Sequence, residues 1–594
     1  MKTQLDIENE NLEIMITKGI NELQTAKETG TVSELKQSGA VMSYYVGALA
    51  NNLKLYSDQV LMGKAKIKAL PAKMLVVLDP LVVAHYTVKS LVDSVGKKYT
   101  SIVSLAQKLA HYLEVEYKVS LLEEDTQKNF VKYIQGTSYK NDRQFKITSG
   151  LLAKYHKDIT KHDLSFYKLA SKCILMLSEV SPIVKNQITP PICYIKEQVG
   201  VETRAEPARW FTEWLSEMVT QNDGMILPEY HTPLIEPPIE WTSNYGGGFH
   251  STRFKYPLVK TQVDTGEFSK KPKRTMAAVN RLQNTKWRIN TKVLEVMLAA
   301  SENDLGWGDL PTPYDAKKHL TPIPHADVDK SFLTEEQKAD RKLWRKQSAP
   351  HYAEQESRYS KVLAMKRVLL EAKRFQEYEA IYFAYFCDFR GRIYPKASNL
   401  QPQGTDYVKA LLHFTDGKKL DSEEAIMYFC MHGANTFGHG LDKKTLAEKL
   451  KWVDDNHHKI LKSAENPYDL NGLWHESDEE PWLFLAFCFE YAEMNRLGKD
   501  FVSHLPIAFD GSCNGLQHLS AMLLDEVGGE AVNLTSKPSK QDIYDTVRAK
   551  TETLLRGNSE PLAADLVKVT ITRKAGKRTV MIGPSAGTQR ACSK

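Results

Sequence analysis

The spacing of apolar residues along the 594-residue chain predicts mostly helices. Up to about residue 180, apolar residues recur at three- and four-residue intervals with few breakers, as over 101–113 and 167–177. This spacing is typical of amphipathic helices. Over 181–201, prolines and β-branched residues favour loops and a hairpin. The Pro-, Gly- and aromatic-rich stretch 228–257 predicts a boundary.

Helical patterns return in the second half of the chain. A helical period runs over 275–300, and the prolines and glycines of 303–330 predict an exposed insertion. A charged helix is predicted over 335–374, then a short apolar, aromatic run that ends at Asp388. Helical patterns fill most of 421–497. The whole pattern predicts a mostly α fold with a small β-sheet, an α+β protein of several domains.

The segment around Asp510 is the most informative part of the chain. An apolar run, 505–509, predicts a strand that delivers this carboxylate, and a tight turn at Gly511 precedes an apolar helix. Such a turn presents a carboxylate and the Gly511 carbonyl to Mg²⁺, a hard ion that takes oxygen ligands. The alternative is that Asp510 caps the helix that begins near Gly515, and the spacing alone favours capping.

A basic segment near the end of the sequence is a second candidate site. Arg573 and Lys577 lie four residues apart, and Lys574 and Arg578 form an adjacent pair, so each pair shares a helix face. No acidic residue occurs over 566–594. These cations favour binding of an anion such as a triphosphate. The alternative is a solvated basic face.

The stretch DFRGRIY, 388–394, is the third candidate. Arg390 and Arg392 flank a glycine, and two guanidinium groups could hold phosphates or a base pair. The alternative is a surface salt-bridge network with Asp388. Lys409, a little downstream, could join either arrangement.

Composition narrows the class of protein only a little. The net charge of +6 permits a nucleic-acid partner without requiring one. The seven cysteines stand singly, which argues against a zinc site built from CxxC pairs and fits a reducing compartment. The N-terminus is polar, and no stretch is apolar enough to span a membrane, so we expect a cytoplasmic protein without a membrane partner.

Several phrases together resemble the single-subunit, phage-type DNA-directed RNA polymerases. DGSCNGLQH is specific, because related DNA polymerases carry a different phrase after the same Asp. The resemblance is strong over about 230–581 and loose before it. It is carried by PPIEWTSNYGGGF, LQNTKWRINTKVLEV, DFRGRIYP, NLQPQGTDYVKALL, HGANTFG, LAFCFEYA, FDGSCNGLQHLSAM, DEVGGEAVNL and QDIY.

The resemblance implies a right-hand polymerase that transfers nucleotides from ribonucleoside triphosphates by a two-metal mechanism with Mg²⁺. The family's catalytic metal ligand falls on Asp510, with the Gly511 carbonyl beside it. Its triphosphate-binding residues fall on Arg573 and Lys577, the latter with a catalytic role. Its tyrosine near the nascent base pair corresponds to Tyr544.

The resemblance also implies nucleic-acid partners. Arg390, Arg392 and Lys409 correspond to family residues near the template and the RNA–DNA hybrid. Lys97 and Lys98 lie where the family places a loop that reads upstream, double-stranded promoter DNA. A monomer in the cytoplasm of a bacterial host is implied.

The implied domains follow the order of the family. They are an N-terminal promoter-binding domain (1–270), a thumb (271–378), the first half of the palm (379–540) and the start of the fingers (541–594) with an aberrant tail (582–594).

The chain departs from the family pattern after Met581. Ser585 stands where the family has a tyrosine that helps to select ribose, and the family's His-Asp motif with the second metal-binding Asp has no counterpart. The one His-Asp pair, His162-Asp163, lies in a helical, polar context and is interpreted as coincidence. We therefore expect most of the fingers and the second palm half to be missing, through a frameshift or an interrupted gene, and the chain to be inactive alone. The alternatives are a non-catalytic nucleic-acid-binding remnant and the N-terminal half of a split polymerase completed by another, C-terminal chain.

Overall fold

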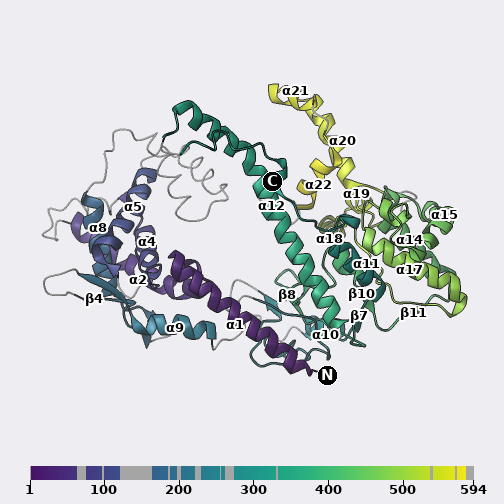
Figure 1. Cartoon of the computed structure of the whole chain (residues 1–594), viewed down its shortest axis with the longest axis horizontal. Coiled ribbons are helices and arrows are strands. Elements are labelled where there is room, and N and C mark those ends of the chain that lie inside the picture. The colour runs from purple at the N-terminus through teal and green to yellow at the C-terminus, as the bar shows by residue number, and fades with distance from the viewer. Residues whose placement is uncertain are drawn as a thin grey trace. The chain divides into compact units, whose positions relative to one another are not determined.

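The computed structural model of the chain consists of two compact units (Figure 1). The first comprises residues 1–285 and 381–399, and the second comprises 286–380 and 400–594. The structure describes residues 2–62, 75, 77–96, 100–120, 164–184, 187–196, 203–220, 229–254, 256–260, 273–329, 332–535, 540–568 and 571–582.

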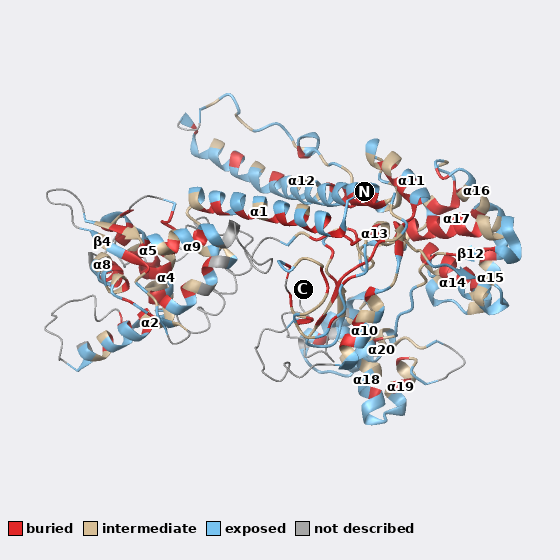
Figure 2. Cartoon of the chain, turned by 90° about the horizontal axis from the view of Figure 1, so that it is seen from below, coloured by how far each residue is buried: buried red, intermediate tan, exposed pale blue. Residues whose placement is uncertain are grey.

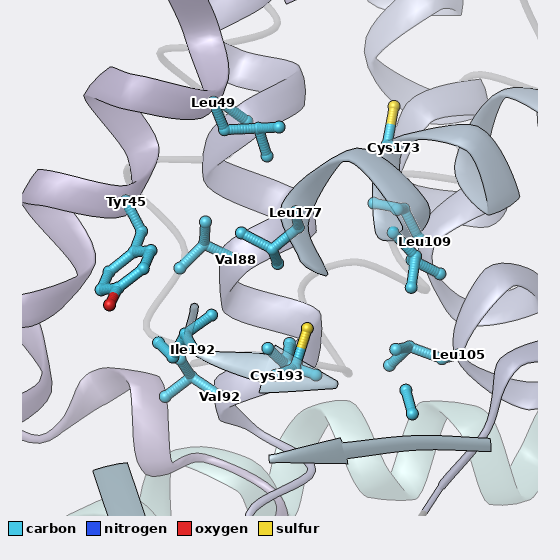
Figure 3. Close-up of a cluster of buried hydrophobic side chains, with 14 of the residues drawn as sticks. Tyr45, Leu49, Val88, Val92, Leu105, Leu109, Cys173, Leu177, Ile192 and Cys193 are labelled. Atoms are coloured by element: carbon cyan, nitrogen blue, oxygen red, sulfur yellow. The ribbon is translucent and has the colours of Figure 1, made fainter. Parts of the chain in front are cut away.

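Helices build most of the first unit. The described ones are α1 (Gln4–Thr29), α2 (Lys36–Leu61), α4 (Pro80–Val92), α5 (Ile102–Ser120), α8 (Leu164–Ser178), α9 (Arg209–Thr220) and α10 (Lys273–Gln283). Leu49 of α2, Val88 of α4, Leu109 of α5 and Leu177 of α8 are fully buried in one hydrophobic core (Figure 3). The apolar spacing therefore predicted these helices correctly, because its stripes are the faces that meet in this core.

The strands of the first unit are short. They are β1 (Thr100–Ser101), β2 (Ile183–Val184), β3 (Gln187–Ile188), β4 (Cys193–Lys196), β5 (Arg204–Pro207), β6 (Val259–Lys260), β8 (Tyr385–Asp388) and β9 (Ile393–Pro395). The hairpin predicted over 181–201 is β2–β3. The aromatic run that ends at Asp388 forms β8, which lies between parallel β6 and antiparallel β9.

The second unit is also mainly helical. Its described helices are α11 (Thr291–Glu302), α12 (Glu335–Phe375), α13 (Asp406–Ala410), α14 (Glu423–Phe437), α15 (Leu446–Asp455), α16 (His457–Glu465), α17 (Pro481–Leu497), α18 (Asn514–Leu523), α19 (Glu526–Ala531), α20 (Ile543–Arg556), α21 (Pro561–Val567) and α22 (Arg573–Ile582). Its described strands are β7 (Trp287–Ile289), β10 (Leu412–Phe414), β11 (Lys418–Lys419) and β12 (Val502–Ser503). The α+β expectation is confirmed.

Helices α14 to α17, here called the helical core, are packed around aromatic side chains. Every residue of α17 from Pro481 to Tyr491 is buried, so this part of the helix is covered on all sides (Figure 2). Phe429 of α14 and Phe487 of α17 lie with ring centroids 5.0 Å apart. A Cβ added at Gly433 would lie 2.3 Å from Phe487, so glycine is needed for this close approach.

Helix α12 spans 41 residues and is buried mainly at one end. Apart from Arg341 and Ser348, its buried residues lie between Val362 and Phe375. A capping box between Thr334 and Gln337 satisfies amides at its start. The charged helix predicted over 335–374 is therefore confirmed, and its first half is exposed to solvent over most of its length.

The predicted helical period over 275–300 is interrupted. The structure has α10, then strand β7, then α11. Strand β7 pairs antiparallel with β10, more than a hundred residues later. This partner is distant in the sequence, so local periodicity could not show it.

The strand predicted over 505–509 is wrong. Only Val502–Ser503 forms a strand, β12, because it pairs with β11, while 504–511 lie outside any strand. Phe509 is 73% exposed, so the apolar character of this run does not mean that its side chains are buried.

The interpretation of Asp510 as a helix cap is also wrong. The N-cap of α18 is Cys513, in the left-handed region at φ 58°, with no side-chain cap.

In the described ranges, none of the helices combines the length and the apolar character that crossing a membrane requires.

Candidate functional site

The loop 510–513 holds the candidate metal-binding carboxylate. Asp510 is exposed, and its Oδ1 accepts a hydrogen bond from the Gly511 amide at 2.8 Å. A Cβ at Gly511 would lie 2.7 Å from Oε1 of Gln517, so the loop passes close to α18. Cys513 is buried, so the loop is anchored at one end while its acid faces solvent.

The donor set of this loop fits part of a hard-cation site. It offers a carboxylate and the neighbouring Gly511 carbonyl, and Mg²⁺ is commonly held by one or two carboxylates, with waters and phosphate oxygens as further ligands. Within the described residues, Oδ2 of Asp510 makes no hydrogen bond. In that same part of the chain, no group of three or more His, Cys, Asp or Glu residues could hold a metal ion.

Two cations lie over one aromatic ring between α20 and α22. The guanidinium carbon of Arg573 is 5.0 Å from the ring centroid of Tyr544, and Nζ of Lys577 is 5.8 Å from it. Four-residue spacing on α22 places both cations on one helix face, as the sequence predicted. Each cation–π contact contributes about 0.5–1 kcal/mol at a partly exposed site.

Asp542 orders this cluster, although it was not among the residues predicted from the sequence. Its Oδ1 caps α20 by accepting hydrogen bonds from the amides of Tyr544 (3.0 Å) and Asp545 (3.3 Å). Its Oδ2 accepts a hydrogen bond from Nε of Arg573. Partial burial alone would raise the pKa of Asp542, but the bonds from Arg573 and the two amides bring it below its usual value. An Asp just before a helical run is an N-cap signal, which could have identified it.

Tyr544 connects the cation cluster with the loop 510–513. Burial, and next a hydrogen bond with the thiol of Cys513, raise the pKa of Tyr544 to about 12. The phenol therefore stays neutral at physiological pH. The structure thus brings Asp510, Tyr544, Arg573 and Lys577 into one neighbourhood of the second unit, although 63 residues separate Asp510 from Arg573 in the sequence (573 − 510).

Lys409 is engaged in an ion pair with Glu480 at the start of α17. Asp406, one helical turn before Lys409, accepts hydrogen bonds from the amides of Trp482 (2.8 Å) and Leu483 (3.0 Å). Burial raises the pKa of Asp406 to about 7 despite these two bonds. The N-cap residue of α17 itself makes no side-chain capping bond, so Asp406 of α13 caps this helix instead.

Arg390 and Arg392 both contact Asp388 in the first unit. The guanidinium of Arg390 donates to Oδ2 of Asp388 at 3.0 and 2.8 Å, and the amide of Arg392 donates to Oδ1 at 2.9 Å. Gly391 turns the chain at φ 86°. The salt bridge considered as the alternative is present for Arg390, and the side chain of Arg392 is exposed.

Comparison with known proteins shows which polymerases the chain is similar to. A family model described as DNA-dependent RNA polymerase matches residues 418–592. The chain is 34% identical to the DNA-directed RNA polymerase of Enterobacteria phage K11 over 411 residues, 62% of this chain and 43% of the relative. It is 28% identical to T7 RNA polymerase of Escherichia phage T7 over 589 residues, 94% of this chain and 63% of the relative. The chain is therefore similar to the single-subunit, phage-type RNA polymerases, and these comparisons support that family.

A mitochondrial DNA-directed RNA polymerase of Schizosaccharomyces pombe is 30% identical over 359 residues. The chain spans 43% of the length of the K11 relative and 63% of the length of the T7 relative. The matched model, 418–592, includes the loop 510–513 and the cation cluster. Lys97, Lys98 and the His162-Asp163 pair lie outside the described residues, as do all residues after Ile582.

Proposed function

We propose that this chain serves template-directed RNA synthesis, in which a nucleotidyl group is transferred from a ribonucleoside triphosphate to an RNA 3′-end. The observation that carries the proposal is the neighbourhood of Asp510, Tyr544, Arg573 and Lys577. An exposed carboxylate whose loop contacts Tyr544 through Cys513, with two cations over the same tyrosine, suits a metal-bound triphosphate, and the names of the similar proteins support the choice of reaction.

The residues divide the work by their chemistry. Arg573 offers a planar guanidinium for phosphate oxygens, and Lys577 adds a point charge that can neutralise charge on the phosphates during transfer. Tyr544 lies under both cations and can stack against a nascent base pair. Asp510 and the Gly511 carbonyl would hold Mg²⁺. When bound, the ion would activate the attacking 3′-hydroxyl and stabilise the leaving pyrophosphate.

The proposed domains and partners extend this assignment. We propose 1–270 as the domain that meets upstream promoter DNA, 271–378 as the thumb, 379–540 as part of a palm and 541–594 as the start of the fingers. Arg390, Arg392 and Lys409 would contact template or RNA–DNA hybrid, and Lys97 and Lys98 promoter DNA. For Arg390 and Lys409, nucleic-acid phosphates would compete with Asp388 and Glu480.

Triphosphate binding tests the assignment directly. A charge-assisted phosphate contact contributes about 1.5–3 kcal/mol, so Lys577→Ala should weaken ATP binding by about tenfold or more. The matched control is Lys574→Ala, because Lys574 is an exposed lysine on the same helix without a cation–π contact to Tyr544. Titration of fluorescently labelled ATP measures the two affinities. Equal weakening by both variants would contradict the assignment.

We further propose that the 594-residue polypeptide does not extend RNA by itself. Two-metal transfer uses two ions held about 4 Å apart by shared carboxylates, and the neighbourhood described here contributes Asp510. Extension of a labelled RNA on a preformed RNA–DNA scaffold bypasses promoter recognition. Robust extension that Asp510→Asn abolishes would overturn this proposal and mean that another acid completes the site. Extension only after addition of a second polypeptide would favour a split enzyme.

A further inference from the structure

Asn533, which directly follows the buried Val532 after α19, connects two parts of the proposed site. Its Nδ2 donates to Oγ of Ser512 at 3.1 Å, in the loop that carries Asp510. The same nitrogen donates to the Gln541 carbonyl at 2.8 Å, and Oδ1 accepts from the Gln541 amide at 2.7 Å. One side chain therefore holds both the loop and the backbone of the residue before Asp542.

Asp542 continues this connection to the triphosphate cations. It follows Gln541 directly, and its side chain caps α20 by accepting hydrogen bonds from the first amides of that helix, including that of Tyr544. It also accepts a hydrogen bond from Arg573. A displacement of the Gln541 backbone therefore moves the carboxylate that orients Arg573. Hydrogen bonds, together with the peptide link between Gln541 and Asp542, therefore form a continuous path from the Asp510 loop through Asn533 to Arg573.

The chemistry of position 533 fits this role. An asparagine amide carries a donor and an acceptor on one planar group, so it can pair with the N–H and C=O of one residue and still contact a hydroxyl. The backbone of Asn533 lies at φ 58°, a conformation that asparagine tolerates better than most residues. Val532 is fully buried, and its carbonyl accepts from Nε2 of Gln517 at 2.8 Å, which fixes the backbone from which Asn533 extends.

We infer that Asn533 is a positioning residue that couples metal binding at Asp510 to triphosphate binding at Arg573. The inference rests on the proposed function of these two residues. Asn533 touches neither ligand, and it acts by holding the loop 510–513 and the start of α20 in one arrangement. Coupling between two ligands is reciprocal, so Mg²⁺ should tighten triphosphate binding through Asp510 by the factor by which triphosphate tightens Mg²⁺ binding.

The test measures the affinity of fluorescently labelled ATP with Mg²⁺ and with Mg²⁺ chelated, in the full chain. Asp510→Asn defines how much of the Mg²⁺ effect passes through the loop, and we expect about fivefold or more. Asn533→Gly removes the side chain, and glycine adopts the positive φ without strain. This variant should abolish the part of the Mg²⁺ effect on ATP affinity that Asp510→Asn removes. The double variant should lose no more than either single variant, because both interrupt one path.

Two further variants separate positioning from general damage. Asp304→Gly changes another exposed residue with positive φ and should leave the Mg²⁺ effect intact. Asn533→Asp keeps the acceptor for the Gln541 amide but loses both donors, so it should behave like Asn533→Gly. Amide hydrogen exchange should be faster over 510–514 and 541–545 in both Asn533 variants. This measurement does not depend on ATP binding.

The outcomes distinguish the inference from the function on which it rests. If the parent chain binds no ATP, both are overturned. If ATP binds and Asp510→Asn reduces the Mg²⁺ effect, but Asn533→Gly leaves that effect unchanged, the coupling role is overturned and the proposed function stands. Additive losses in the double variant would likewise overturn a shared path.

Discussion

The helical core and the segment 509–582, here called the terminal segment, are stabilised in different ways. In the helical core, eleven consecutive residues of α17 are buried, and aromatic rings fill the space between helices. In the terminal segment, Met522, Leu524 and Val527 are 78%, 90% and 78% exposed. Figure 2 shows α17 mostly buried and α18 mostly exposed. The proposed chemistry lies in the segment with little buried apolar surface, where Asn533 and Asp542 supply polar connections instead.

This comparison predicts a large difference in sensitivity to truncated side chains. Phe487→Ala should lower the free energy of unfolding by about 3–5 kcal/mol, because it leaves a cavity among packed rings. Leu523→Ala, at a side chain that is 74% exposed, should change it by about 0.5 kcal/mol or less. Urea unfolding followed by tryptophan fluorescence compares the two. Similar losses for both variants would mean that the terminal segment is packed as tightly as the helical core.

Two buried histidines should make the packed part of the second unit sensitive to acid. Burial lowers the pKa of His413 to about 3 and that of His432 to about 4. Below pH 6.5 the unfolded chain binds protons that these two folded imidazoles do not, so stability falls as the pH falls from 6.5 toward 4. Each histidine contributes up to about 1.4 kcal/mol per pH unit.

Urea unfolding between pH 7.5 and 5 measures that slope. His413→Gln and His432→Gln should each flatten it, while His458→Gln, at an exposed position of α16, serves as the matched control. A slope that the two buried variants leave unchanged would assign the acid sensitivity to other groups.

The smallest predicted effect concerns the polar connection in the terminal segment. Asp542→Asn keeps an oxygen to cap α20 but removes the charge that pairs with Arg573. Both side chains are more than a third exposed, so solvent screens the ion pair. The loss in the free energy of unfolding should therefore be about 0.2–1 kcal/mol. Hydrogen exchange of the Tyr544 and Asp545 amides would report it as protection lowered by about fivefold or less. No change in exchange would mean that the ion pair adds nothing to the order of α20.

The sequence predicted well where local pattern and packing agree. Helix α12 and the shared face of Arg573 and Lys577 follow from spacing alone, because they are properties of one helix. The strand expected over 505–509 failed, since an apolar run shows neither whether a partner strand exists nor whether its side chains are buried. Strand β7 failed for the opposite reason, because its partner is distant in the sequence.

The candidate residues were chosen from the sequence, but the hydrogen bonds that connect them were not predictable from it. Asp510, Arg573, Lys577 and Tyr544 were chosen from motif and charge. Asn533 carries no such signal, because its role depends on a hydrogen bond to a loop 21 residues away in the sequence.

Helix α12 has a mechanical consequence. At about 1.5 Å per residue, its 41 residues make a rod about 60 Å long, and its buried residues apart from Arg341 and Ser348 lie between Val362 and Phe375. A rod held at one end acts as a lever, so each degree of rotation at the buried end moves the other end by about 1 Å. A spectroscopic label at the exposed Lys346 would therefore magnify small rearrangements near Phe375 into displacements that distance measurements resolve.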